Sequence, residues 1–236
     1  MVTTAEHISQ QFEKELQDVR SRVLAMGGLL EKQVSGALEA LMTGEADLAR
    51  QVIETDKEVN ALEMSIDEEC IQILALRQPT AGDLRLVTAI LKTITDLERI
   101  GDEAASIARM ALNLSEKDRP KKNYRELQSL GHHVIGMLRD ALDAFARFDV
   151  DQAFKVASED QEVDAEYETI IRQLITYMME DPRAVTRALD MMWSARSLER
   201  IADHAHNVCQ HIIYLVEGKD VRHLSIDKME KLLKNS

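Results

Sequence analysis

The sequence has few of the residues on which β-rich and disulfide-stabilised proteins depend. Of its 236 residues, 4% are aromatic, 9 are glycine, 3 are proline and 2 are cysteine. This is poor material for sandwiches and barrels, whereas the abundant Ala, Leu, Ile, Met, Glu, Lys and Arg favour long helices. Cys70 and Cys209 lie far apart and form no CxxC motif, which indicates reduced thiols in a cytosol rather than a disulfide framework.

Long hydrophobic segments and an excess of positive charge are missing too. No run approaches the roughly 18–20 apolar residues that span a bilayer, and the first 15 residues contain no apolar stretch typical of a secretory signal. The chain has 29 basic and 42 acidic residues, a formal net charge of −13. Such a charge repels phosphodiester backbones and anionic lipid heads, so we expect no nucleic-acid binding and no direct membrane insertion.

What the sequence does contain is a series of amphipathic helices around a sizeable core, since 45% of it is apolar. Pro79, Pro120 and Pro182 mark breaks, because proline cannot continue a helix interior. Between them apolar residues recur every three or four positions, as in 97–114 and 198–215. The pattern predicts a short amphipathic tail over 224–234 and six long helices near 5–43, 45–77, 81–115, 122–148, 150–180 and 183–217.

The sequence also contains an internal repeat. Leu-Glu-Arg-Ile-Gly-Asp at 97–102 recurs as Leu-Glu-Arg-Ile-Ala-Asp at 198–203, an offset of 101. Asp-Lys-Glu-Val-Asn at 56–60 recurs as Asp-Gln-Glu-Val-Asp at 160–164, an offset of 104. The difference falls in the proline-containing turn, where a change of length costs little. The offset of 104 also aligns two further pairs, Gly27 with Gly131 and Leu38 with Leu142.

This repeat predicts an all-α fold built as a tandem repeat of two antiparallel three-helix bundles. The first bundle is expected over 1–117 and the second over 118–221. A C-terminal tail over 222–236 follows them.

Acidic side chains recur at matching positions of the two repeats. Glu98 and Asp102 lie four residues apart, as do Glu199 and Asp203, so each pair occupies one face of a helix. If each repeat folds back at its proline, the preceding helix brings a second polar pair to the same height. These additional candidates are Asp56 and Asn60 in the first repeat and Asp160 and Asp164 in the second.

Several carboxyl or amide groups at one height would repel one another without a cation, so we predict a metal site in each repeat. Oxygen ligands favour Mg²⁺, Mn²⁺, Ca²⁺ or iron over zinc. A helical-wheel count places both ExxxD motifs nearly opposite the apolar stripes, so the sites should face water. His206, three residues after Asp203 on the same face, is at most an extra ligand of the second site. In the alternative interpretation these are solvated acidic faces, neutralised by Arg99 and Arg200.

No motif for an enzyme is found. The sequence contains no Walker A, GxGxxG, GxSxG or HExxH motif, and no ExxH of the ferritin-like di-iron type. Trp193 is interpreted as a packing anchor. Two groups of residues are given no functional role: histidines without an identifiable partner (His132, His133, His204 and His211) and methionines expected in the core (Met26, Met42, Met64, Met178, Met179, Met191 and Met192).

With these features the chain resembles the PhoU family of phosphate-specific transport accessory proteins. The resemblance covers nearly the whole length, and it is carried by the two three-helix repeats, by Arg-Gln-Pro-Thr-Ala-Gly-Asp-Leu-Arg at 77–85, and by the ERIGD and ERIAD segments. It implies a cytoplasmic regulator rather than an enzyme, which restrains phosphate uptake and negatively regulates phosphate-starvation (Pho regulon) signalling. The implied partners are the ATPase subunit of a phosphate ABC transporter, a phosphate-sensing histidine kinase and a second copy in a homodimer. These partners would recruit it to the inner face of the membrane.

The resemblance also implies metal binding at the E/D-xxx-D motifs, with iron, manganese, magnesium or zinc as the ion. Asn60 departs from the family pattern, because an amide stands where the second repeat has a carboxylate, so the first site should bind its ion more weakly. A metal-independent acidic scaffold for protein–protein interaction and, less favoured, a metal-dependent hydrolase remain as alternatives. The pairs to which the motifs correspond are Glu98 and Asp102, Glu199 and Asp203, and the similar Asp160 and Asp164.

Overall fold

Helices account for nearly all of the chain. The computed structural model describes residues 4–115 and 125–234, with side chains from residue 10 onward, and within these ranges it contains no strand. The predicted all-α class is therefore confirmed, although the start of the helix expected at 122–148 falls outside the described residues. The elements are α1 (Thr4–Thr43), α2 (Ala46–Arg77), α3 (Ala81–Ser115), α4 (Arg125–Arg147), α5 (Val150–Glu180), the 3₁₀ turn η1 (Pro182–Ala184), α6 (Val185–Glu217) and α7 (Ile226–Lys234).

The breaks between helices occur at a proline and at aspartate side chains that cap the next helix or turn. Gln78, with φ 48°, ends α2 directly before Pro79. The side chain of Asp149 accepts a hydrogen bond of 3.0 Å from the backbone N–H of Gln152, which caps the start of α5. The carboxylate of Asp181 likewise accepts from the N–H of Arg183 at the turn into α6. These turns fold α2 back on α3, α4 back on α5 and α5 back on α6.

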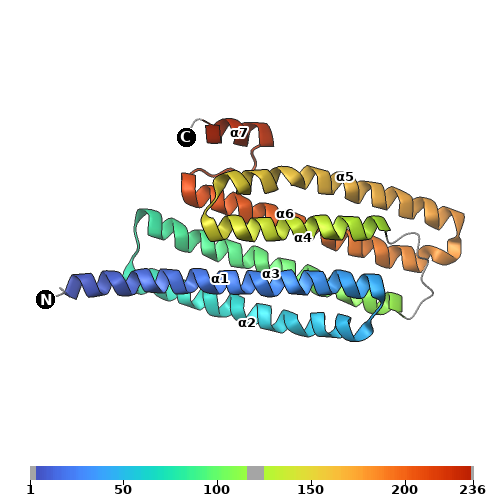
Figure 1. Cartoon of the computed structure of the whole chain (residues 1–236), viewed down its shortest axis with the longest axis horizontal. Helices are drawn as coiled ribbons and strands as arrows, with labels where there is room; N and C mark the ends of the chain where they lie inside the picture. Colours follow the sequence, from blue (N-terminus) through green and yellow to red (C-terminus); the bar gives the residue numbers. More distant parts are fainter. Residues whose placement is uncertain (1–3, 116–124, 235–236) are drawn as a thin grey trace.

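The six long helices form two groups of three that lie side by side (Figure 1). α1, α2 and α3 pack on one another, as do α4, α5 and α6, while α3 packs extensively on α6. These two helices run antiparallel, since Lys92 near the start of α3 lies 5.2 Å from the ring centre of Tyr214 near the end of α6. Buried residues of both groups form one continuous apolar cluster. The boundary expected at 117 lies outside the described ranges.

α1 and α4 cross at two glycines that the repeat aligns. A Cβ atom at Gly27 would lie 2.5 Å from the Leu142 side chain, and a Cβ atom at Gly131 would lie 2.5 Å from Leu38. The contact is therefore made twice, once in each direction. The helices approach this closely because neither glycine carries a side chain. Arg139 of α4 adds a hydrogen bond of 2.7 Å to Glu31 of α1 at the same crossing.

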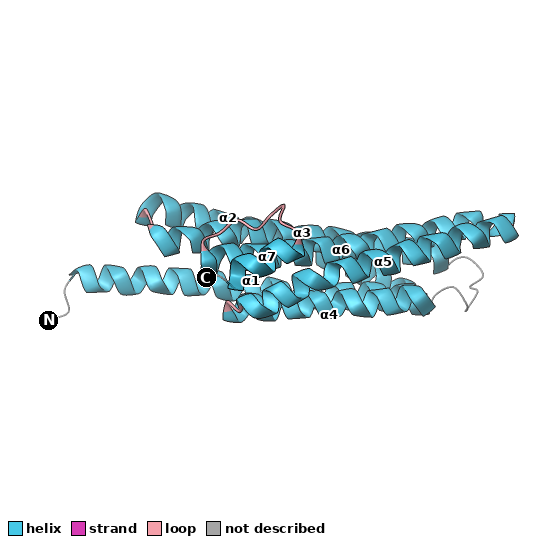
Figure 2. Cartoon of the chain, turned by 90° about the horizontal axis from the view of Figure 1, so that it is seen from above, coloured by secondary structure: helices cyan, strands magenta, loops and turns pink. Residues whose placement is uncertain are grey.

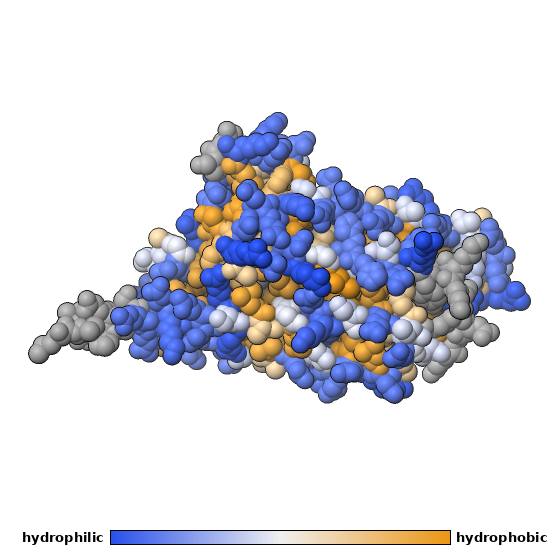
Figure 3. Space-filling view, in the orientation of Figure 1, coloured by the Kyte–Doolittle hydropathy of each residue, from blue (hydrophilic) through white to orange (hydrophobic). Residues whose placement is uncertain are grey.

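The periphery differs from the core in composition and packing. The N-terminal part of α1 projects beyond the rest of the molecule, and α7 lies outside the two groups against α5 (Figures 1 and 2). Hydrophilic side chains cover most of the face seen in Figure 3, with apolar patches between them. None of the described helices combines the length and the apolar character that a membrane span requires.

Three residues expected in the core are on the surface instead. Met26 and Met191 are buried as expected, but Met64 is 62% exposed and Met179 is 80% exposed. Trp193 is 58% exposed, so its interpretation as a packing anchor is wrong. These three side chains lie on faces of α2, α5 and α6 that are in contact with water, and an apolar residue on such a face is common in folded proteins.

Candidate functional site

In the second repeat, α5 and α6 bring the predicted acidic residues together. Burial raises the pKa of Asp203, and the negative charges of Asp160 and Asp164 raise it further. The pKa of Glu199 is raised in the same way, by burial and then by the charge of Asp203. His206 joins the group, because its Nδ1 lies 3.1 Å from Oδ2 of Asp160. We call these five residues the second acidic cluster.

The second acidic cluster is less open to water than expected. Asp164 and Asp203 are exposed at its rim, whereas Asp160, Glu199 and His206 are half-buried. Oε2 of Glu199 is buried and accepts no hydrogen bond from any described residue. The site lies on the outside of the bundle as expected, although packing of α5 on α6 half-buries three of its members. An unpartnered carboxylate oxygen of this kind is suited to a cation.

In the first repeat a similar group of acidic residues lies between α2 and α3, but an arginine partly neutralises its negative charge. Burial raises the pKa of Glu98, as do the charges of Asp102, Glu63 and Asp56. Arg99 opposes this rise, with its guanidinium 3.2 Å from Asp102 and 3.4 Å from Glu98. We call Asp56, Asn60, Glu63, Glu98 and Asp102 the first acidic cluster.

The sequence interpretation missed two residues at this site: Glu63, which belongs to the first acidic cluster, and Gln33, which lies beside it. Glu63 lies three residues after Asn60 and was not considered, although this spacing places both on one face of α2. Gln33 is buried on α1 and donates a hydrogen bond of 3.2 Å to Asp56. Oδ1 of Asn60 is buried without a described partner, like Glu199 in the other cluster.

In both clusters, side chains that could bind a metal lie near one another but do not form a complete coordination sphere. Within residues 10–115 and 125–234, no three histidine, cysteine, aspartate or glutamate side chains converge as closely as metal ligands do. In kind, the donors fit a hard cation, because they are carboxylates with one amide or one imidazole.

A partly buried hydrogen-bond network on the seam between α3 and α6 was not predicted at all. Asp96 of α3 lies 2.8 Å from Nδ1 of His204 and 2.8 Å from Nε2 of His211, and it accepts a third bond of 3.1 Å from Asn207. Burial opposes ionisation of Asp96, but these three hydrogen bonds outweigh it and lower its pKa to about 2. His204 and His211 were left without a partner because that partner belongs to the other repeat.

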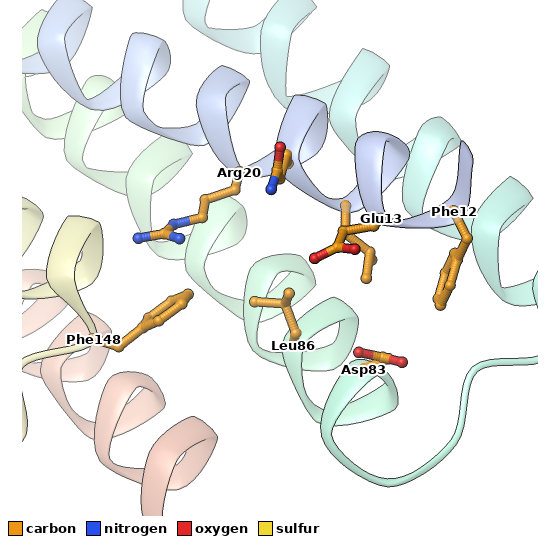
Figure 4. Close-up of a pocket in the computed structure, with 8 residues that line it drawn as sticks. Phe12, Glu13, Arg20, Asp83, Leu86 and Phe148 are labelled. Atoms are coloured by element: carbon orange, nitrogen blue, oxygen red, sulfur yellow. The ribbon is translucent and has the colours of Figure 1, made fainter. Parts of the chain in front are cut away.

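A separate hollow lies where α1, the start of α3 and the α4–α5 turn meet (Figure 4). Its volume is about 390 Å³, and Figure 4 shows Glu13 and Asp83 at one end and Arg20 near Phe148 at the other. The guanidinium of Arg20 lies 4.1 Å from the Phe148 ring centre, which is a cation–π contact. The hollow contains no predicted site residue.

Comparisons with known proteins agree with this architecture. The model of the PhoU domain matches the chain twice, over residues 23–111 and 127–212. A "Phosphate-specific transport system accessory protein PhoU homolog" from Pseudomonas aeruginosa strain PAO1 is 54% identical over 230 residues, which cover 98% of this chain and 95% of that protein. The "Phosphate-specific transport system accessory protein PhoU" of Escherichia coli K12 is 52% identical, over 96% of this chain and 94% of that protein.

Solved structures show the same relationship. The crystal structure of PhoU from Pseudomonas aeruginosa superposes with a TM-score of 0.86 at 54% identity, covering 88% of this chain and 100% of the other. The structure of "the phosphate transport system regulatory protein PhoU from Streptococcus pneumoniae" gives a TM-score of 0.82 at 31% identity, covering 89% and 99%. With both repeats matched and the fold shared along nearly the whole length, the chain belongs to the PhoU family.

Proposed function

We propose that this chain is a cytoplasmic regulator of phosphate transport that acts as a metal-binding adaptor and not as an enzyme. It would link the ATPase subunit of a phosphate ABC transporter to a phosphate-sensing histidine kinase, and so restrain phosphate uptake and starvation signalling. The observation that carries the proposal is the family match in both repeats, with relatives named as accessory or regulatory proteins of phosphate transport. A homodimer is part of the proposal.

The two acidic clusters are the proposed metal-binding elements. They occupy equivalent places in the two repeats, on helices fixed by a common core, so they would present charge in a constant geometry. A bound cation supplies positive charge that offsets the repulsion among the carboxylates. In the second cluster the four carboxylates and His206 would hold it. In the first, Asp56, Glu98 and Asp102 would do so, with Asn60 in place of a carboxylate.

Loss of the second cluster is expected to abolish the stronger of two metal-binding events. Isothermal titration calorimetry with Mn²⁺ and Mg²⁺ would compare the wild type with Glu199→Ala/Asp203→Ala and with Glu98→Ala/Asp102→Ala. We expect the second-cluster variant to lose more of the heat, because the first cluster has an amide at Asn60 and a guanidinium between its carboxylates.

A matched control would remove two negative charges elsewhere on α5. Asp151→Ala/Glu162→Ala changes two exposed residues and the same net charge, so it should titrate like the wild type. Equal heats for the control and both cluster variants would show that the clusters bind no metal.

A metal-independent scaffold is the second candidate function, and two observations favour it. No described set of side chains is arranged as a finished metal site, and Arg99 already neutralises part of the first cluster. In this case the acidic surfaces would dock on basic partner surfaces directly, in a salt-sensitive manner.

Pull-down of the purified transporter ATPase subunit or the kinase, with and without EDTA, separates the two candidates. The adaptor proposal expects capture to fall when metal is removed and to return when Mn²⁺ is added back. If EDTA does not change the amount of captured partner, but a higher salt concentration reduces it, the result would support the metal-independent scaffold.

A further inference from the structure

The seam between α3 and α6 contains a groove beside Asp102 of the first acidic cluster, and metal binding at the clusters gives this groove no role. It has a volume of about 480 Å³ and lies where α3 approaches its end and α6 begins. Arg109 of α3 and Arg196 and Arg200 of α6 line it, together with the indole of Trp193. Small-molecule sites typically measure roughly 300–1,000 Å³, so the groove is of a suitable size for a ligand larger than an inorganic ion.

The groove is a basic place on an acidic protein. The net charge of the chain is −13, yet three guanidinium groups meet here. The two carboxylates of the lining are already engaged, since Arg200 lies 3.0 Å from Glu103 and Arg99 lies 3.2 Å from Asp102. The ion pair with Glu103 neutralises Arg200, and the guanidinium of Arg196 is hydrogen-bonded to Tyr167 and faces Glu199. Arg109 is exposed, and no ion pair or hydrogen bond to another described residue holds it. Its donors are therefore free for an anion.

The internal repeat shows that helix packing does not require these side chains. At the offset of 101, Arg109 corresponds to Gln210, Arg196 to Thr95 and Trp193 to Lys92. The other half of the seam packs with these residues, where Gln210 lies 2.8 Å from His206. Arg109, Arg196 and Trp193 thus belong to one half alone, whereas Arg200 recurs in the other half as Arg99.

We propose that this groove binds a mononucleotide, with its phosphate at Arg109 and Arg196 and its base against Trp193. Arginine binds phosphate through paired, charge-assisted hydrogen bonds. An indole that is 58% exposed offers a flat face on which a base can stack. Inorganic phosphate would leave the indole unused, and a nucleic-acid strand would meet the repulsion of the rest of the surface.

Trp193 makes the proposal directly measurable, because it is the single tryptophan of the chain. Its intrinsic fluorescence would be followed while AMP, ADP, adenosine and inorganic phosphate are added separately, all with EDTA present to exclude binding through metal. We expect saturable quenching by AMP and ADP. Adenosine and phosphate should bind roughly tenfold more weakly or worse, since each satisfies half of the site.

Variants that borrow residues from the other half test the role of the arginines. Arg109→Gln/Arg196→Thr introduces the residues that the repeat itself places at the equivalent positions and leaves Trp193 intact. We expect its affinity for AMP to fall roughly tenfold or more, with an unchanged helical circular dichroism spectrum. Lys57→Gln/Lys155→Gln removes the same positive charge from exposed sites on α2 and α5, and should bind AMP like the wild type.

Three results would overturn the proposal. The first is the absence of saturable quenching by AMP and ADP at millimolar concentration, supported by the absence of binding heat in calorimetry. The second is AMP binding that the arginine variant retains in full. The third is AMP binding that calorimetry detects without any change in the fluorescence of Trp193. Because EDTA is present throughout, these outcomes do not depend on whether the acidic clusters bind metal.

Discussion

Replacing Gly27 and Gly131 together by valine is expected to lower the free energy of unfolding by about 2–6 kcal/mol, since overfilling a packed site costs roughly 1–3 kcal/mol. A Cβ atom at either position would lie 2.5 Å from a leucine side chain of the opposite helix, well inside van der Waals contact. Leu142 and Leu38 would have to adopt other side-chain conformations, or α1 and α4 would have to separate at both points of their crossing. Urea denaturation followed by circular dichroism measures the loss.

Gly28 provides the control, because it is adjacent in sequence and exposed, and nothing lies within 4 Å of a Cβ atom placed there. Gly28→Val should leave stability within about 0.5 kcal/mol of the wild type, as surface substitutions usually do. If the double variant were as stable as Gly28→Val, the close crossing of α1 and α4 would be wrong.

Asp96→Ala is expected to destabilise the protein by roughly 2–4 kcal/mol, because it leaves one buried and two half-buried donors without their acceptor. His204, Asn207 and His211 all point at this carboxylate across the seam. Asp96→Asn should cost less, since its amide oxygen can still accept, whereas Glu162→Ala at an exposed position of α5 should cost almost nothing. Thermal and urea denaturation of the three variants would give this order. Equal stability of Asp96→Ala and Glu162→Ala would contradict a structural role for the network.

The pH dependence of the same variant has a definite sign. The pKa of Asp96 in the folded protein is about 2, below the ordinary 3.8, so the carboxylate stabilises the folded state fully at pH values above its unfolded pKa. This contribution is lost as the pH falls through 3.8 towards 2. The stability difference between wild type and Asp96→Ala should therefore shrink over that interval, and a difference that grows there would be inconsistent with the network.

Much of the fold could be predicted because helix periodicity and helix breaks are local properties. Pro79 and Pro182 mark the fold-back points of the two hairpins, and each hairpin then sets which residues of neighbouring helices share a height. This is why the sequence alone places Asp160 and Asp164 beside Glu199. The structure brings these residues together as expected.

What could not be predicted depends on how one repeat packs on the other. His204, Asn207 and His211 recur on one face of α6, which was a visible signal for a shared partner. The partner, Asp96, lies in the other repeat, and no local pattern shows that α3 and α6 run antiparallel in contact. The exposure of Trp193 was missed for a related reason: periodicity shows which residues share a face but not whether another element covers it.

The antiparallel seam of α3 and α6 also constrains how the chain can be divided. Each of these helices presents apolar residues such as Ile100 and Ile201 to an interior that both repeats share. A polypeptide cut down to a single repeat would leave that surface bare to solvent. It would have to form a symmetric pair with another copy of itself to bury the apolar surface that the two repeats bury against each other in the intact protein.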